Sequence, residues 1–174
     1  MTESQSTPTE QPRPLDPAEM ALVVQRLRSE QNLGLGTVAG VAAAVIGAAV
    51  WAAVTVFTHY QIGWMAVGVG FLVGLAVRTL GKGVDRVFGI VGAGLALLGC
   101  LVGNFLATCG MVAQREDLAF LEILSRLDTR IIKKLMVAAF SPMDLLFYGI
   151  AVYEGYKLSF RQVSAEEMAK RVTG

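Results

Sequence analysis

Charged side chains are missing from long parts of this sequence. Asp, Glu, Lys and Arg do not occur between residues 31 and 77, nor between residues 87 and 114. These four residue types make up 17% of the chain, below the roughly 25% of soluble domains. Each uncharged stretch exceeds the about 20 apolar residues that cross a bilayer. The lack of charge argues against a soluble domain and predicts a membrane protein with several spans.

Residues that support catalysis or metal binding are also scarce. The chain has one histidine, His59, and two cysteines, Cys100 and Cys109. His59 has no ionisable neighbour in the sequence, so a catalytic or pH-sensing role is only the alternative to a structural one. The cysteines fall on nearly opposite faces of one helix, which favours packing roles over a disulfide or a metal site. We therefore predict no enzyme active site, no metal and no cofactor.

Apolar runs are what the sequence has in excess. Hydrophobic residues make up 54% of the chain, and the mean hydropathy is +0.55. These runs predict an all-α fold, a polytopic membrane bundle that occupies residues 34–160. Its four transmembrane helices are expected at about residues 35–57, 62–80, 87–110 and 142–159. The fourth is at the short limit for a crossing, so a re-entrant segment is the alternative.

Small residues recur every four positions along the predicted spans. Residues four apart share a helix face, so each series makes a smooth stripe that lets another backbone approach closely. We expect the stripes of the first and second spans to pack against each other. The bulky side chains Val45, Ile46, Val50 and Trp51 are expected on the opposite face of the first span. The glycines assigned to helix packing are Gly36, Gly40, Gly70, Gly74, Gly99 and Gly103.

Three polar residues near or within the spans are the functional candidates. Asn104 is expected to hydrogen bond to another helix, or alternatively to line a substrate path. Asp144 follows Ser141 and Pro142, an order typical of a capped helix start. Glu154 is expected to pair with Lys157 one turn later.

Four segments outside the spans differ in character. Residues 1–15 predict a disordered tail, and residues 161–174 a cytoplasmic tail. Residues 16–33 predict a short amphipathic helix that begins at Asp16 and lies either on the membrane or against a neighbouring helix. Residues 114–140 predict an insert of two amphipathic helices of about 10 residues each, with Asp128 capping the second.

Basic residues set the expected topology. Loop 59–61 has none, whereas loop 78–86 and both terminal segments are basic, which places both termini in the cytoplasm. Segment 115–134 is also basic yet would lie outside. Either it forms a folded external cap, or the last helix is re-entrant; we favour four crossings.

Three stretches carry a resemblance to known proteins. Residues 63–74, 89–104 and 141–157 resemble segments of a bacterial family of multi-pass integral membrane proteins with no assigned activity. The resemblance covers roughly residues 35–160. It implies a bacterial source, the inner membrane and a shared four-helix unit, and it carries over no catalytic residue.

These observations lead to a ranked expectation of function. A non-enzymatic scaffold or interaction subunit comes first; it would bind the lipid bilayer, another membrane protein or a second copy of itself. With a net charge of +1, the chain has no field that points to nucleic acid. A small oligomeric transporter or channel is the alternative. Its path would have to be lined by Asn104, Thr55, Thr108, Asp144 and Glu154, since ion paths need polar groups within the spans.

Overall fold

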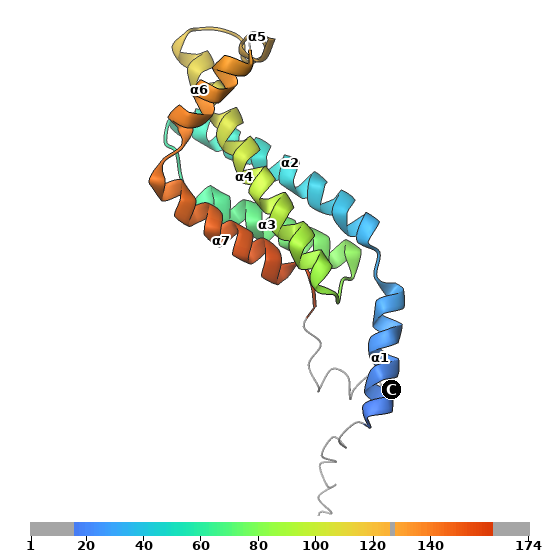
Figure 1. Ribbon diagram of the computed structural model, residues 1–174. Helices are drawn as coiled ribbons and strands as arrows, with labels where there is room; N and C mark the ends of the chain where they lie inside the picture. The colour runs from blue at the N-terminus through green and yellow to red at the C-terminus, as the bar shows by residue number, and fades with distance from the viewer. Residues whose placement is uncertain (1–15, 126–127, 162–174) are drawn as a thin grey trace, which may run out of the picture. The chain divides into compact units, whose positions relative to one another are not determined.

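The described chain is helical throughout. The computed structural model describes residues 16–125 and 128–161, and this part contains helices and no strands (Figure 1). The predicted tails at residues 1–15 and 162–174 lie outside the described residues. The chain divides into two compact units, residues 31–161 and a unit that contains α1 (Pro17–Glu30). The all-α prediction is confirmed.

Helix α1 begins as the sequence predicts. The backbone N–H of Ala18 donates to the Asp16 carboxylate at 3.4 Å, next to Pro17 in the first turn. Leu27 is buried, whereas Leu22 is 67% exposed. The helix therefore keeps part of its apolar surface open.

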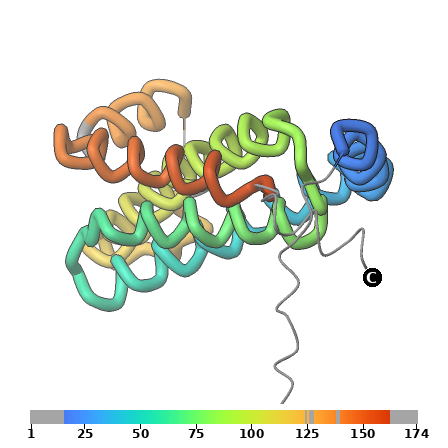
Figure 2. Tube along the Cα trace, turned by 90° about the horizontal axis from the view of Figure 1, so that it is seen from below, coloured from blue at the N-terminus to red at the C-terminus, as the bar shows by residue number. Residues whose placement is uncertain are grey.

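The larger unit is built on four long helices that lie alongside one another (Figures 1 and 2). α3 and α4 contact each other and both outer helices, α2 and α7. α2, α3 and α4 are each long and apolar enough to cross a membrane, whereas α7 is a 17-residue helix. The bounds are α2 (Leu33–Thr58), α3 (Trp64–Gly81), α4 (Arg86–Arg115) and α7 (Pro142–Leu158).

Local sequence explains where these helices begin and end. The Asn32 side chain accepts a hydrogen bond from the Leu35 N–H at 2.9 Å and so caps α2. His59 ends the same helix in the left-handed conformation, with φ 59°, and donates its N–H to the Thr55 carbonyl at 2.9 Å. Its position is that of a C-cap. α4 continues past the predicted residue 110 to Arg115, because Met, Ala, Gln and Arg favour helix after the apolar run ends.

Burial in the bundle follows side-chain size. Ala43, Ala44 and Ala48 are buried along α2, while Val45 and Ile46 point outward with exposures of 62% and 57%. Trp51 was expected on this outer face, but it is fully buried. It lies three residues after Ala48, and residues three apart share a face. The tryptophan therefore extends the small-residue stripe into the core.

The stripe of α3 faces a different partner from the one expected. A Cβ built on Gly70 would lie 2.7 Å from the Ala151 Cα on α7, and one on Gly74 would lie 2.7 Å from the Leu158 Cβ. Between α2 and α3, glycine meets glycine at Gly36 and Gly81, whereas Gly40 and Gly47 of α2 lie against the Val77 and Val69 side chains of α3. The stripe-to-stripe packing of the first two spans is therefore wrong over most of their length. The four-residue spacing defines a smooth face but carries no information about its partner.

α4 presents smooth surfaces to two neighbours. Near its start, Gly92 lies against the Gly155 carbonyl and Ser159 of α7. Further along, a Cβ on Gly99 would lie 3.2 Å from that of Ala44, and one on Gly103 would lie 3.3 Å from the Cα of Ala48. Because α4 approaches both α7 and α2 closely, it lies at the centre of the bundle.

Backbone hydrogen bonds join three segments at one end of the bundle. The Asn32 N–H donates to the Gly81 carbonyl, and the Arg161 N–H donates to the Gly83 carbonyl, both at 2.9 Å. The Gln31 side chain donates to the Asp85 carboxylate at 2.6 Å. The start of α2, the α3–α4 loop and the end of α7 thus lie at the same end.

The opposite end carries two short helices, α5 (Phe120–Ser125) and α6 (Thr129–Ala139) (Figure 1). Asp128 caps α6 by accepting the Thr129 N–H at 2.6 Å, as predicted. α5 is shorter than expected, with six residues. The chain first turns at Asp117, which has φ 51°, and therefore enters this helix late.

Candidate functional site

Asn104, one of the functional candidates from the sequence, lies in the core of the bundle. It is 6% exposed, and its side-chain oxygen accepts a hydrogen bond from Gln61 Nε2 at 2.5 Å. Gln61 belongs to the α2–α3 loop, so the bond joins α4 to a loop and not to another helix. A buried amide needs such a partner because desolvation without one is costly.

Asp144 has the capping geometry that the sequence predicts. It is 5% exposed, and its carboxylate accepts the Ser141 N–H at 2.8 Å. The Ser141 hydroxyl accepts the Met143 N–H at 3.4 Å and completes a capping box. These bonds account for the buried carboxylate at the start of α7.

Glu154 lies near the other end of α7 and is partly buried. Glu154 does not form the ion pair with Lys157 that the spacing allows; the Lys157 ammonium lies over the Tyr153 ring, 5.3 Å from its centroid. With a rise of 1.5 Å per residue, Glu154 and Asp144 are about 15 Å apart along the helix. The structure therefore does not bring the two acidic candidates together.

Three buried polar atoms form the least expected feature of the core. They have no hydrogen bond to any residue in the described ranges, although Trp51 and Thr55 are fully buried and Tyr148 is 4% exposed. The rings of Trp51 and Tyr148 meet edge to face, with centroids 6.4 Å apart. The atoms are Trp51 Nε1, Thr55 Oγ1 and Tyr148 Oη.

Thr55 differs from the other threonines of α2, α3 and α4. The rest donate their hydroxyls to the carbonyl four residues earlier, at 2.7–2.9 Å, which is the usual bond for a threonine in a helix. Thr55 does not make this bond. The threonines that do are Thr37, Thr58, Thr79 and Thr108.

Asn104 connects one of these atoms, the Tyr148 hydroxyl, to the candidate residues that the sequence predicted. Its side chain faces the Tyr148 hydroxyl without meeting hydrogen-bond geometry, and Asp144 lies one turn before Tyr148 on α7. Sequence reasoning proposed Asn104 and Asp144 but overlooked Trp51, Tyr148 and Gln61. For Trp51, the three-residue spacing from Ala48 was the sequence signal that indicated burial. No local sequence pattern identifies Gln61, because its role depends on the α2–α3 loop folding over α4.

The cysteines behave as packing residues within the described ranges. Both are buried and free of disulfides, and Cys100 Sγ lies 3.7 Å from the Ala66 carbonyl of α3. Among described residues, no group of three or more His, Cys, Asp or Glu side chains could hold a metal ion. The polar cluster of Asn104, Gln61, Trp51, Thr55 and Tyr148 therefore consists of amides, hydroxyls and an indole.

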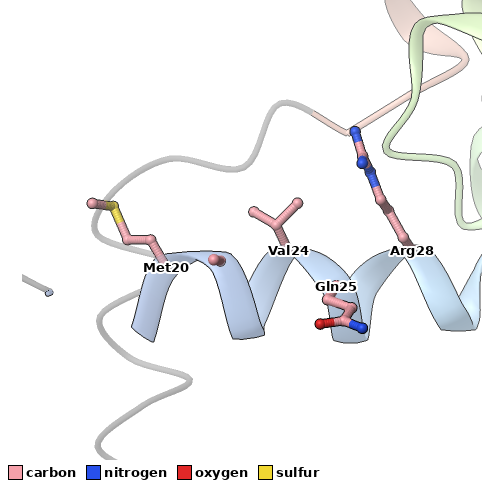
Figure 3. Close-up of a pocket in the computed structure, with 5 residues that line it drawn as sticks. Met20, Val24, Gln25 and Arg28 are labelled. Atoms are coloured by element: carbon pink, nitrogen blue, oxygen red, sulfur yellow. The ribbon is translucent and has the colours of Figure 1, made fainter. Parts of the chain in front are cut away.

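Helix α1 carries a separate surface pocket (Figure 3). Met20, Val24 and Arg28 project from one side of the helix, and Gln25 projects from the other (Figure 3). The lining is apolar along the helix with a guanidinium at one end, a surface suited to an apolar partner. Its residues are Met20, Ala21, Val24, Gln25 and Arg28.

No protein-family model, curated protein or solved structure matches this chain. The resemblance to a bacterial membrane family therefore stays a prediction.

The hydrogen bond between Gln61 and Asn104 makes a quantitative prediction. We expect Asn104→Leu and Gln61→Leu each to destabilise the bundle, and the double variant to cost less than the sum. The coupling should be about 0.6–1.7 kcal/mol, as for other polar contacts between membrane helices. Reversible unfolding of all four proteins in mixed micelles measures it. Strict additivity would mean that the two side chains do not interact.

Proposed function

We propose that this chain is a four-span integral membrane protein that acts as a scaffold or interaction subunit and not as an enzyme. One observation carries the membrane assignment. The described helices bury many of their Gly and Ala residues and turn many large apolar side chains outward, with Val38 67%, Ile90 64% and Leu98 56% exposed. Water would disfavour so large an apolar surface, whereas acyl chains solvate it.

Contacts of α7 support a fourth crossing. Phe147, near its start, packs on Gly63 and Trp64 at the beginning of α3. Arg161, just beyond its end, bonds to Gly83 beyond the end of α3. α7 therefore accompanies α3 over its full length, and a re-entrant segment would turn back before that. We propose the bacterial inner membrane as the location, with both termini in the cytoplasm.

Two features support a scaffold role. The span helices are held by close backbone contacts, a design that favours a rigid platform over a moving one. Outside them, α1 offers an open apolar surface around Leu22 and the pocket that Met20 and Val24 line. A membrane protein or a second copy of this chain is the partner that we propose for this surface.

Site-directed labelling tests the membrane topology. We expect Tyr60→Cys to react with an impermeant maleimide from outside intact cells, and Lys82→Cys to react only after permeabilisation, since the two positions lie at opposite ends of α3. Val45→Cys, whose side chain faces acyl chains, should react in neither case. Recovery of the chain as a detergent-free, water-soluble monomer would contradict the proposal, as would labelling of Tyr60→Cys and Lys82→Cys from one side.

A transporter or channel is the second candidate, and the unpaired atoms of Trp51, Thr55 and Tyr148 favour it, because a polar path needs polar groups within the spans. Solute and ion flux in proteoliposomes separates the two proposals. A scaffold predicts no flux above that of empty liposomes. Flux that falls in Tyr148→Phe and in Asp144→Asn would establish transport instead.

A further inference from the structure

Helix α6 lies across the bundle axis. The segment Thr129–Val137 is bent by 93° from α7, and α7 packs along α3 and α4. α6 also contacts α4 at the end of the bundle that carries α5 (Figure 1). If α7 crosses the bilayer, as proposed above, α6 runs parallel to the membrane surface. Its orientation is therefore that of a helix in the headgroup layer.

The two sides of α6 differ in chemistry. At 100° per residue, Arg130, Lys133 and Lys134 fall on one side and are exposed. Ile131, Ile132, Leu135 and Met136 fall on the other side. The helix contains no acidic residue, so its polar side carries three positive charges. Val137 lies among these cations and is 77% exposed.

The rest of the described chain leaves the cationic side and part of the apolar side available. Ile131 and Met136 are 43% and 38% exposed, although they belong to the apolar side. Arg130, Lys133 and Lys134 form no ion pair with any residue of ranges 16–125 and 128–161. The open apolar surface continues past the helix end at Phe140 and Met143, which are 47% and 60% exposed. It therefore joins the outward apolar surface of α7.

We propose that α6 lies in the headgroup layer and binds anionic phospholipid, with its cations on the phosphates and Ile131 and Leu135 among the upper acyl chains. The proposal rests on the membrane assignment made above. It also gives a role to three of the basic residues of segment 115–134, which a purely aqueous cap does not explain. A broken span formed by α6 and α7 would instead place three cations in hydrocarbon, which is strongly unfavourable.

Spin labels on the full chain test this placement. A label at Ile131→Cys should be accessible to oxygen, which dissolves in acyl chains. A label at Val137→Cys, on the same helix, should be accessible to a water-soluble nickel chelate. The protein is reconstituted in phosphatidylcholine bilayers with or without phosphatidylglycerol. The buried native cysteines stay in place, and the chain without an added cysteine gives the background.

Charge removal tests the lipid preference. Each cation near an anionic surface adds about fivefold to binding, so Lys133→Gln should lower the ratio of lipid-bound to unbound Ile131 label about fivefold. Lys82→Gln, at the other end of the bundle, should leave the ratio unchanged. Added salt should weaken the preference for phosphatidylglycerol.

Two outcomes overturn the proposal and are distinguishable from failure of the membrane assignment. If the Ile131 label is in water in both bilayers, α6 is not a lipid-binding helix and its apolar side is free for a protein. If the Ile131 label enters lipid equally with and without phosphatidylglycerol, anionic recognition is wrong. A label at Val45→Cys reports the membrane assignment itself: it stays in acyl chains in either case, and only its exposure to water would contradict that assignment.

Discussion

Phe88→Ala is expected to lower the free energy of unfolding by about 3–5 kcal/mol, the usual cost of removing a fully buried aromatic ring. Phe88 is 2% exposed in the first turns of α4. Its ring lies against Gly36, Gly81 and Gly83, which come from α2, the end of α3 and the loop that follows. Glycines cannot refill the space, so the cavity would stay open. Unfolding in mixed micelles measures the loss.

Phe71→Ala is the matched control for this prediction. Phe71 is 51% exposed on the outer face of α3, where acyl chains can replace the ring. Its removal should change stability by only about 0.5 kcal/mol, as for other surface substitutions. Equal losses in the two variants would contradict the assignment of Phe88 to the core.

Gly70→Ala is expected to destabilise the bundle by about 1–3 kcal/mol, although alanine is the better helix former. A Cβ at this position would lie 2.7 Å from the Ala151 Cα and would also contact its carbonyl oxygen. These are backbone atoms that no rotamer change can move away. The α3–α7 interface would have to open, and the midpoint of thermal unfolding in detergent should fall.

Gly68 offers a control on the same helix. No atom lies within 4 Å of a Cβ built there, so Gly68→Ala adds a methyl group without a clash. The substitution should stabilise α3 by up to about 1 kcal/mol through helix propensity. The two glycines, two residues apart, thus predict effects of opposite sign. Destabilisation by Gly68→Ala would show that this face is packed in the protein.

The sequence predicts the helices because their signals are local. An uncharged run reveals a span whichever helix lies beside it, and Ser141, Pro142 and Asp144 mark the start of α7 through bonds within four residues of each other. Asp128 marks the start of α6 in the same way. The sequence therefore predicted most helix boundaries, apart from the extension of α4 to Arg115 and the short length of α5.

The sequence could not predict which helices pack against each other, and the reason is physical. Gly36, Gly70 and Gly103 all lie on smooth faces, but they meet α3, α7 and α2 respectively, and nothing in the spacing distinguishes them. The polar cluster also depends on which helices and loops meet in the folded bundle. Asn104 could be recognised as a buried amide, whereas its partner Gln61 is 43 residues away and in a loop.

The bonds at Gly81 and Gly83 have a consequence for biosynthesis. Among the described helices α7 leaves the ribosome after all the others, and the faces it covers include Gly70, Gly74 and Gly92. A nascent chain that ends before residue 142 would hold these glycines against lipid. It would also leave the Gly83 carbonyl without Arg161. Synthesis of α7 thus closes the bundle, and products that stop before this helix should be degraded faster because these glycine faces stay uncovered.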